Sequence, residues 1–557
     1  MRPAAEPERW AAGATPRERR PVTVTCRRRR LLEIALAGCR AAFLVAFGCL
    51  GCPTPARGRA DDRRCLVSLN ARPQPVVRRS GRQTLIALVA TVAATLAFFP
   101  LELRAESLLI QNARLIDGTG APPRGPVSIL VRDGRISEIA QDIAGAGVST
   151  LDVAGSTVIP GLIDAHVHLM EVPGSDVRGD APERLLALQH EQLRSYLACG
   201  VTTVLDTATT VAVARELHAW VASGHAGPTY LTLGPPIAPH GGYMSGTNPD
   251  LTVGSIHDLD RVFDAIASVG AIGVKVPIER GFGSDSVFPI HSPEVRDAIR
   301  RKAAERRLPI YVHASDEVEQ TIGLDMGAHA LAHLNFANLA GLEASPEFIA
   351  RAASAGTYMV TTFSTIDAGL ARWETSRLDD ASVQLAVPVV ERETARSAGA
   401  WAARDVSELA FAFPRWPRLA LRVFARLSPP LKAPEAAALA ANLRSAKQLY
   451  DAGVPLVIGS DAGNSSLRSA FHGTSTLREL ELLAEAGVPA VDVLAAATRV
   501  SAEMLGIGDA GTVERGKRGD LVVLASDPLA NIRAIRAIRW TVKAGVVHTP
   551  QEWMQQP

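Results

Sequence analysis

Two histidines one residue apart, His166 and His168, lie near the end of an apolar stretch that covers residues 158–169. The stretch predicts a buried strand, and side chains two positions apart on a strand point to the same side. Both imidazoles would therefore leave the strand together near its carboxyl end, where a metal ion could take two nitrogen ligands. A pair of this kind is weak evidence alone, so further ligands must come from other segments.

Further side chains that bind metals or carry protons occur in later apolar segments. Each has an ordinary explanation, such as a core histidine with a hydrogen-bond partner or an aspartate that caps the next helix. A lysine inside an apolar segment is costly to bury unless it is neutralised or paired. Their occurrence in order on successive predicted strands favours one shared site. These residues are Lys275, His313, His329, His333 and Asp461.

His329 and His333 compete for one ligand position. They are four residues apart in the segment 328–334, so they share one strand face and alternation alone leaves the choice open. His333 lies nearer the carboxyl end of the segment, the end at which the other candidate ligands are expected.

Strand-like and amphipathic helical segments alternate through the centre of the chain. Eight strands with intervening helices predict an α/β fold of the (β/α)8 TIM-barrel type, although the same count would suit a doubly wound sheet. In a TIM barrel the catalytic groups gather at the carboxyl ends of the strands. The predicted strands are 158–169, 201–207, 229–236, 273–279, 309–315, 328–335, 356–363 and 455–462.

Two strand-rich regions flank the predicted barrel, which covers residues 158–510. Residues 106–157 include two short apolar segments about an Asp-Gly turn, and residues 511–557 contain two more strand-like segments. We therefore expect a small β-sandwich domain assembled from segments on both sides of the barrel.

A long interval at about 366–440 interrupts the alternation of strands and helices. It exceeds an ordinary connection in length and carries Trp373, Trp401 and Trp416. We interpret it as a helical insertion above the barrel mouth. A structural helical hairpin is slightly favoured over a lid or a lipid-facing element.

The composition is that of a globular protein, with 47% hydrophobic and 21% charged residues. Residues 1–105 contain 19 Arg and no Lys against 7 acidic residues, a net charge of +12, and the remainder carries −10. The mildly acidic net charge of this remainder, the body of the protein, argues against nucleic-acid binding. Cys199 is the only cysteine of that body, which therefore needs no internal disulfide.

We interpret residues 1–105 as a leader. The run 85–101 is apolar and uncharged, and it follows a cluster of arginines at 78–82. A basic flank and an apolar run are typical of a signal peptide. If the run were retained, it would anchor the protein in the inner membrane. We therefore expect a periplasmic or secreted protein, and the alternative is a disordered cytoplasmic extension followed by a core helix.

Because a signal peptide normally lies at the amino terminus, we expect translation to start near Val76 or Val77, with the upstream residues absent from the native protein. Amino-terminal sequencing of protein purified from its native cells should give a terminus beyond that point. A peptide recovered from residues 1–70 would contradict this expectation.

From about Leu108 to Val547 the sequence resembles the metal-dependent amidohydrolases, particularly their imidazolonepropionase-like and prolidase-type branch. The opening strand with its two histidines, the ligands of the middle strands, the final Asp461 and a closing segment at 511–524 match in order. The resemblance implies a TIM barrel with a small β-sandwich domain. It also implies two divalent metal ions, with zinc as the expected metal.

The resemblance implies which residues hold each metal ion. His166, His168 and Asp461 would hold the more buried one, and His313 and His333 would hold the second. The family spacing thus favours the histidine that lies nearer the carboxyl end of its segment.

The resemblance also gives the buried lysine a role. Carboxylation of the Lys275 amine would give a carbamate, which turns a cation into an oxygen-donor anion that bridges both metals. A hydroxide between the metals would attack the carbonyl of an amide. Asp461 would accept the proton of the water and deliver it to the leaving nitrogen.

Four residues are candidates for the substrate side of the site. His240, which follows the segment 229–236, could donate to the developing oxyanion, although a plain loop histidine explains it equally well. Arg280, Tyr243 and His472 could contact substrate, with a surface position as the simpler explanation for Arg280.

Two alternative functions stay open from the sequence. The first is a mononuclear cyclic-amide hydrolase or deaminase, but the deaminase pattern needs a Glu three residues after His313, where Asp316 stands. The second is a non-catalytic binding relative, which would typically have lost ligands that are all present here. We expect a small-molecule amide, with a preference for dipeptides or N-acyl amino acids, no nucleic-acid partner, and a chain compatible with a homo-oligomer.

Overall fold

The computed structural model describes eight stretches of the chain, and all of them fall within the second of two units, Leu101–Pro557. The leader 1–105, with its apolar run 85–101, therefore lies outside the described residues. Among the residues that are described, no helix has both the length and the hydropathy needed to span a membrane. The described stretches are 107–144, 147–170, 182–281, 288–334, 342–371, 375–401, 432–463 and 469–556.

The centre of the chain is the predicted TIM barrel, whose parallel strands are assigned to a three-stranded and a five-stranded sheet. Backbone hydrogen bonds join the two sheets at both edges. The amide of Ile272 donates to the carbonyl of Thr232 over 3.0 Å, and the amide of Asp461 donates to the carbonyl of His166 over 2.8 Å. The strands are β6 (Leu162–Val167), β7 (Val201–Asp206), β8 (Thr229–Thr232), β9 (Val274–Pro277), β10 (Ile310–His313), β11 (Ala330–Ala332), β12 (Tyr358–Val360) and β13 (Leu456–Val457).

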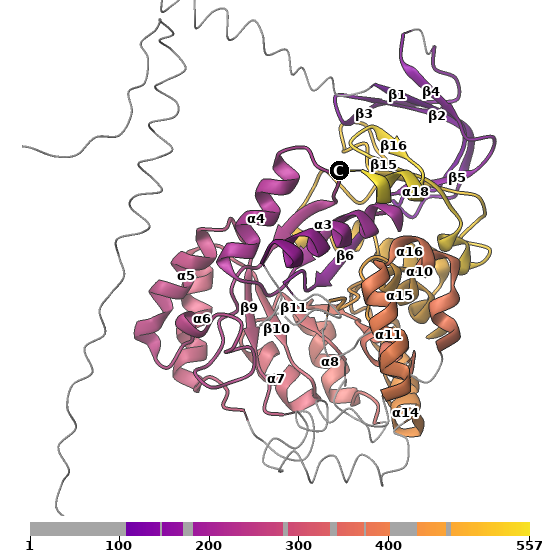
Figure 1. Cartoon of the computed structure of the whole chain (residues 1–557). Helices are drawn as coiled ribbons and strands as arrows, with labels where there is room; N and C mark the ends of the chain where they lie inside the picture. The colour runs from indigo at the N-terminus through magenta and orange to yellow at the C-terminus, as the bar shows by residue number, and fades with distance from the viewer. Residues whose placement is uncertain are drawn as a thin grey trace, which may run out of the picture. The chain divides into compact units, whose positions relative to one another are not determined.

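Helices follow the strands and cover the outside of the barrel (Figure 1). Their starts are marked by capping side chains: the hydroxyls of Ser292 and Ser345 and the carboxylate of Asp316 each accept a backbone amide of the first turn. Asp316, the residue at the deaminase position, is thus the cap of α7. The helices are α3 (Pro182–Ala198), α4 (Val211–Ala222), α5 (Leu259–Ala267), α6 (Pro293–Glu305), α7 (Glu317–Asp325), α8 (Pro346–Ala355), α9 (Phe363–Ala371), α10 (Ala381–Ala386), α11 (Val389–Trp401), α14 (Lys432–Asp451), α15 (Thr474–Glu485), α16 (Ala490–Ala496), α17 (Arg499–Leu505) and α18 (Pro550–Gln555).

Strands from both flanks of the barrel form one eight-stranded sheet with its own hydrophobic cluster. Its order is β16-β15-β14-β5-β1-β2-β3, and β4 pairs with β1. Segments from the two ends of the described chain therefore lie side by side in it. The strands are β1 (Leu108–Leu115), β2 (Arg124–Arg132), β3 (Arg135–Ala140), β4 (Ser149–Asp152), β5 (Thr157–Pro160), β14 (Leu521–Leu524), β15 (Ile538–Lys543) and β16 (Val546–His548).

The prediction of one continuous strand over residues 158–169 is wrong in detail. The stretch is two strands in two sheets, because β5 pairs with β14 of the small sheet whereas β6 pairs with β7 of the barrel. Gly161 separates them, and its amide donates to the carbonyl of Asp520 over 2.8 Å. A Cβ at Gly161 would lie 2.2 Å from Oγ1 of Thr202, so only glycine fits this passage.

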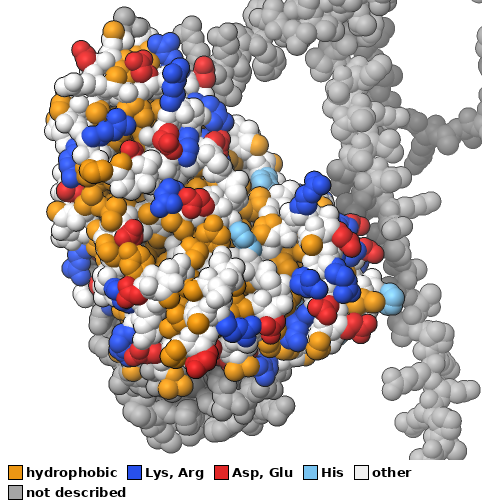
Figure 2. All heavy atoms as spheres, turned by 180° about the vertical axis from the view of Figure 1, so that it is seen from behind, with side chains coloured by type: hydrophobic (Ala, Val, Ile, Leu, Met, Phe, Trp, Pro, Cys, Tyr) orange, Lys and Arg blue, Asp and Glu red, His pale blue; other side chains and the backbone are white. Residues whose placement is uncertain are grey.

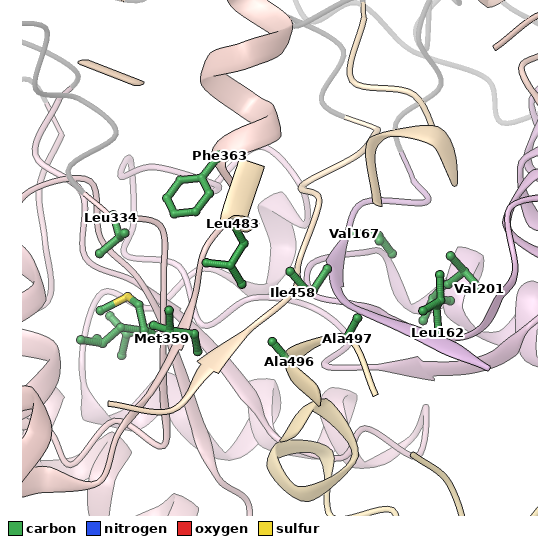
Figure 3. Packing of buried hydrophobic residues seen from close by; sticks show 14 of the residues in the cluster. Leu162, Val167, Val201, Leu334, Met359, Phe363, Ile458, Leu483, Ala496 and Ala497 are labelled. Atoms are coloured by element: carbon green, nitrogen blue, oxygen red, sulfur yellow. The ribbon is translucent and has the colours of Figure 1, made fainter. Parts of the chain in front are cut away.

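Apolar side chains fill the layer between the barrel strands and the helices. Figure 3 shows part of this cluster, to which β6 and β7 contribute Leu162 and Val201, β12 contributes Met359, and Phe363 begins α9. Burial of each large aliphatic or aromatic side chain contributes about 1.5–3 kcal/mol. This packing fixes the strand ends from which the polar candidates project.

The surface is of mixed charge where it is described. Figure 2 shows Lys and Arg side chains interspersed with Asp and Glu over one face, between hydrophobic and neutral groups. Neighbouring charges of opposite sign largely cancel, so this face has no extended field of one sign.

The predicted insertion is helical where it is described, in α9 to α11 and the start of α14. Its residues 402–431 and 372–374, with Trp416 and Trp373, lie outside the described residues. Glu391 of α11 is fully buried, and its Oε1 accepts a hydrogen bond of 2.9 Å from Nε2 of Gln192 on α3. Burial raises the pKa of Glu391 to about 8. The described part of the insertion is therefore packed against the barrel.

We predict that Glu391→Gln removes a pH-dependent loss of stability. Between the ordinary carboxyl pKa of 4.5 and the raised value of about 8, the folded state holds a proton that the unfolded state has released. The contribution of Glu391 to the free energy of unfolding therefore falls as the pH rises from 4.5 to about 8. The variant should gain roughly 1 kcal/mol in free energy of unfolding at pH 9 and little at pH 5, by urea denaturation. Glu393→Gln, at an exposed position of the same helix, is the control, and equal behaviour of the two variants would contradict the prediction.

Candidate metal centre

The predicted ligands meet at the carboxyl ends of the barrel strands. Oδ1 of Asp461 lies 2.9 Å from Nε2 of His168 and 3.3 Å from Nε2 of His166. Nζ of Lys275 lies 3.5 Å from Nε2 of His166. One donor atom from each of His166, His333 and Asp461 lies within 4.8 Å of the other two. Residues separated by almost 300 positions thus converge on one small volume.

His313 joins this cluster through its ring contacts. Its imidazole centroid lies 4.7 Å from that of His333, and the His333 centroid lies 5.1 Å from that of His166. The structure therefore brings together all six side chains that the sequence singled out as ligands. His168 is the most exposed of the six, with 13% of its side chain accessible, and the others are buried.

The donor set fits a divalent metal ion. Oδ1 of Asp461 is buried, and the Nε2 atoms of His166 and His168 lie within 3.3 Å of it. Buried polar atoms are normally hydrogen-bonded, and a cation placed between such atoms would satisfy them together. Nitrogen and carboxylate-oxygen donors are those that zinc and similar ions take in proteins.

Burial sets the protonation of these groups. Burial, assisted by the nearby charge of Lys275, lowers the pKa of His166 to about 3, and burial holds the pKa of His333 well below its usual value. The same effect lowers the pKa of Lys275 to about 7. Burial alone would raise the pKa of Asp461, but the adjacent imidazoles outweigh it and hold that pKa well below its usual range. Neutral imidazoles and an ionised carboxylate are the forms that ligate metals.

Two of the candidate ligands are held in an uncommon backbone conformation. His333 has φ +73° and Asp461 has φ +52°, both in the left-handed region that favours glycine. Thr362, with φ +49°, places its hydroxyl 2.8 Å from Nδ1 of His333. Oγ1 of Thr365 donates to Oδ2 of Asp461 over 3.3 Å. Strain of this kind persists where surrounding contacts impose it, and it concentrates at functional sites.

Two buried carboxylates form hydrogen bonds with the segments that carry the candidate ligands. Asp164, two residues before His166, accepts the amide of Ser460 over 2.9 Å and the hydroxyl of Thr476 over 2.6 Å. Glu479 accepts the amides of residues 363 and 364 at the start of α9. The first contact joins β6 to the segment that carries Asp461, and the second fixes the segment that supplies Thr362 and Thr365.

Sequence reasoning missed these supporting residues. Asp164 carried a signal, because a carboxylate inside an apolar strand must find buried donors. Glu279, a buried carboxylate whose Oε2 lies 3.3 Å from Nε2 of His313, carried the same signal. The threonines carried none, because threonine is common in strands and loops alike.

The structure separates the two competing histidines of the sixth barrel strand. His333 lies in the cluster, whereas Nε2 of His329 lies 2.8 Å from the carbonyl of Met504 in α17. The ring of His329 packs on Tyr311 and Tyr358 instead. The two residues lie at opposite ends of the short strand β11.

The candidate substrate residues fall into two groups. The ring of Tyr243 lies 4.7 Å from that of His313, so Tyr243 borders the cluster. His472 is buried, with Nδ1 2.8 Å from the hydroxyl of Tyr196, and its ring lies against Gly463, two residues after Asp461.

Arg280 and His240 are the more exposed candidates. Nε of Arg280 lies 3.9 Å from Oε1 of Glu319, and 38% of its side chain is accessible. His240 is exposed and has Nδ1 3.1 Å from Oγ1 of Thr252. The substrate roles of all four residues stay predictions.

The chain belongs to the Amidohydrolase family, whose profile matches residues 157–547. A dihydroorotase of Streptococcus pneumoniae serotype 4 is 37% identical over 103 residues, which are 18% of this chain and 22% of that protein. An L-hydantoinase of Paenarthrobacter aurescens is 26% identical over 156 residues, which are 28% of this chain and 31% of that protein. The chain thus spans less than a third of the length of each of these curated relatives.

Solved structures share the fold. A Xaa-Pro dipeptidase with bound methionine in its active site superposes with a TM-score of 0.60 at 23% identity, over 80% of this chain and 100% of that one. At this identity the likeness shows the fold, a TIM barrel with the flanking β domain, and leaves the substrate open.

We predict that His333→Ala lowers metal content whereas His329→Ala preserves it. Only the first substitution removes a donor from the cluster, and loss of a ligand should weaken binding of its ion enough for dialysis to remove it. Metal analysis of the dialysed proteins should show about one equivalent less in the first variant. Equal metal content in the two variants would contradict the assignment.

Proposed function

We propose that the protein is a metal-dependent amidohydrolase that cleaves a carbon–nitrogen amide bond of a small molecule. The observation that carries the proposal is the convergence of His166, His333 and Asp461, whose donor atoms lie within 4.8 Å of one another. Bound divalent ions would lower the pKa of a water molecule and polarise the substrate carbonyl. Membership of the family supports this chemistry.

The protein's own residues would move the proton. Asp461 would take the proton of the attacking water and hand it to the leaving nitrogen, as general base and then general acid. Thr365, which donates to Oδ2, would hold that carboxylate in one orientation during both transfers. Orientation matters because proton transfer needs the donor and acceptor within hydrogen-bond reach.

Lys275 would contribute as a carbamate. It is fully buried, and Nζ lies 3.5 Å from a histidine nitrogen, where an ammonium group would oppose a bound cation. Attack of the neutral amine on carbon dioxide forms a carbon–nitrogen bond and releases one proton, which leaves an anionic oxygen donor. Such a group would bridge two ions, and zinc is the ion that we expect.

Dipeptides or N-acyl amino acids are the substrates that we infer. The solved structure of similar fold is a Xaa-Pro dipeptidase, which supports a substrate of this class, and Tyr243 beside His313 offers an aromatic ring next to the cluster. Arg280 would pair with a substrate carboxylate, and His240 would donate to the oxyanion. Export through the leader would place such an enzyme where it could scavenge short peptides.

We predict that Lys275→Ala lowers the metal content from about two equivalents to one or less and abolishes activity on a panel of dipeptides and N-acyl amino acids. The bridging donor is lost, so at least one ion loses its anchorage. Lys447→Ala, at a surface pair with Asp451, is the control and should keep both properties. Unchanged metal and activity in Lys275→Ala would refute the bridge, and one equivalent in the unmutated protein would favour the mononuclear alternative.

A further inference from the structure

Glu279 is a buried carboxylate that the proposed chemistry does not use. It follows β9 and stands four residues after Lys275, with 1% of its surface accessible. Its Oε1 accepts the amide of Gly281 over 2.6 Å, and its Oε2 accepts the hydroxyl of Ser315. The same Oε2 lies 3.3 Å from Nε2 of His313. Both oxygens are thus held in place, and one of them faces a candidate ligand.

The neighbouring buried acid has partners of its own. Glu319, the neighbouring buried acid, accepts the amides of Arg280 and Ser315, and the guanidinium of Arg280 lies 3.9 Å from Glu319. A buried carboxylate is stabilised by each further donor that faces it. The imidazole of His313 is a side chain that Glu279 faces directly and that can donate to it.

The geometry of imidazole then decides which nitrogen binds metal. A neutral ring carries one proton, and a proton on Nε2 that is donated to Glu279 leaves the lone pair on Nδ1. The two nitrogens point in divergent directions, so a ring whose Nε2 faces Glu279 presents Nδ1 elsewhere. His333 is the opposite case, because its Nδ1 faces Thr362 and leaves Nε2 for the cluster.

We propose that Glu279 is a positioning residue that fixes His313 as an Nδ1 ligand of the second metal ion. The inference rests on the proposed metal-dependent function. A carboxylate behind a ligating imidazole fixes its tautomer and orientation and makes it a stronger ligand, and its loss typically costs 10–100-fold in metal affinity. Glu279 acts through His313, because its Oε2 faces Nε2 of that ring over 3.3 Å.

The test is zinc titration of the metal-free full-length chain against a competing chelator, with Glu279→Gln, Glu279→Ala and the control Glu319→Gln. Glu319 is equally buried and accepts the backbone amides of Arg280 and Ser315, so it controls for the removal of a buried charge. We expect one of two ions to bind about 10–100-fold more weakly in Glu279→Gln, and more weakly still in Glu279→Ala.

Three further readouts separate positioning from a loss of fold. The other ion should bind as in the unmutated protein, the melting temperature of the metal-free variant should match that of Glu319→Gln, and excess zinc should restore kcat with KM unchanged. Unchanged affinity for both ions, or equal weakening of both with a lowered melting temperature, would overturn the proposal. If the unmutated protein binds no zinc, both the proposed metal-dependent function and the positioning role of Glu279 fail. If every variant binds two ions tightly, only the positioning role of Glu279 is refuted.

Discussion

The structure depends on one electrostatic constraint, the gathering of several titratable side chains in a space that excludes water. His166, His313, His333, Lys275 and Asp461 are all buried, and one carboxylate stands among imidazoles and an amine. Removal of ionisable groups from water costs several kcal/mol for each charge unless partners compensate. The histidines respond by staying neutral, and this leaves nitrogen lone pairs and a carboxylate aimed at the same volume. A cation in that volume turns a costly arrangement into a favourable one.

The remainder of the fold holds this arrangement in place before any ion binds. Left-handed backbone at His333 and Asp461 would relax in a loose loop, so its presence requires firm contacts on either side. Asp164 and Glu479 supply them, because each accepts donors from a segment that carries a ligand or its supporting threonine. A buried carboxylate is useful here because it can accept several hydrogen bonds from different segments at once. These hydrogen bonds of Asp164 and Glu479 thus stabilise the strained backbone at the candidate ligands His333 and Asp461.

The sequence allowed prediction of the barrel and of the residues that meet in it, because strand ends in this fold converge by topology. It failed at residues 158–169, since an apolar run does not reveal that Gly161 passes the chain from one sheet to another. Strand alternation could not choose between His329 and His333, and the choice of His333 came from its position nearer the carboxyl end of the segment and from the family spacing. The contact of Thr365 with Asp461 joins positions 96 residues apart and leaves no local pattern to read.

The central claim is that this cluster is a two-metal centre, and anomalous diffraction from crystals of the zinc-loaded protein tests it most directly. The account predicts two strong peaks at the zinc edge, the first within bonding distance of His166 and Asp461 and the second of His313 and His333. It also predicts extra density on Nζ of Lys275 between the two peaks. A single peak with an unmodified lysine, or peaks away from these five side chains, would contradict it.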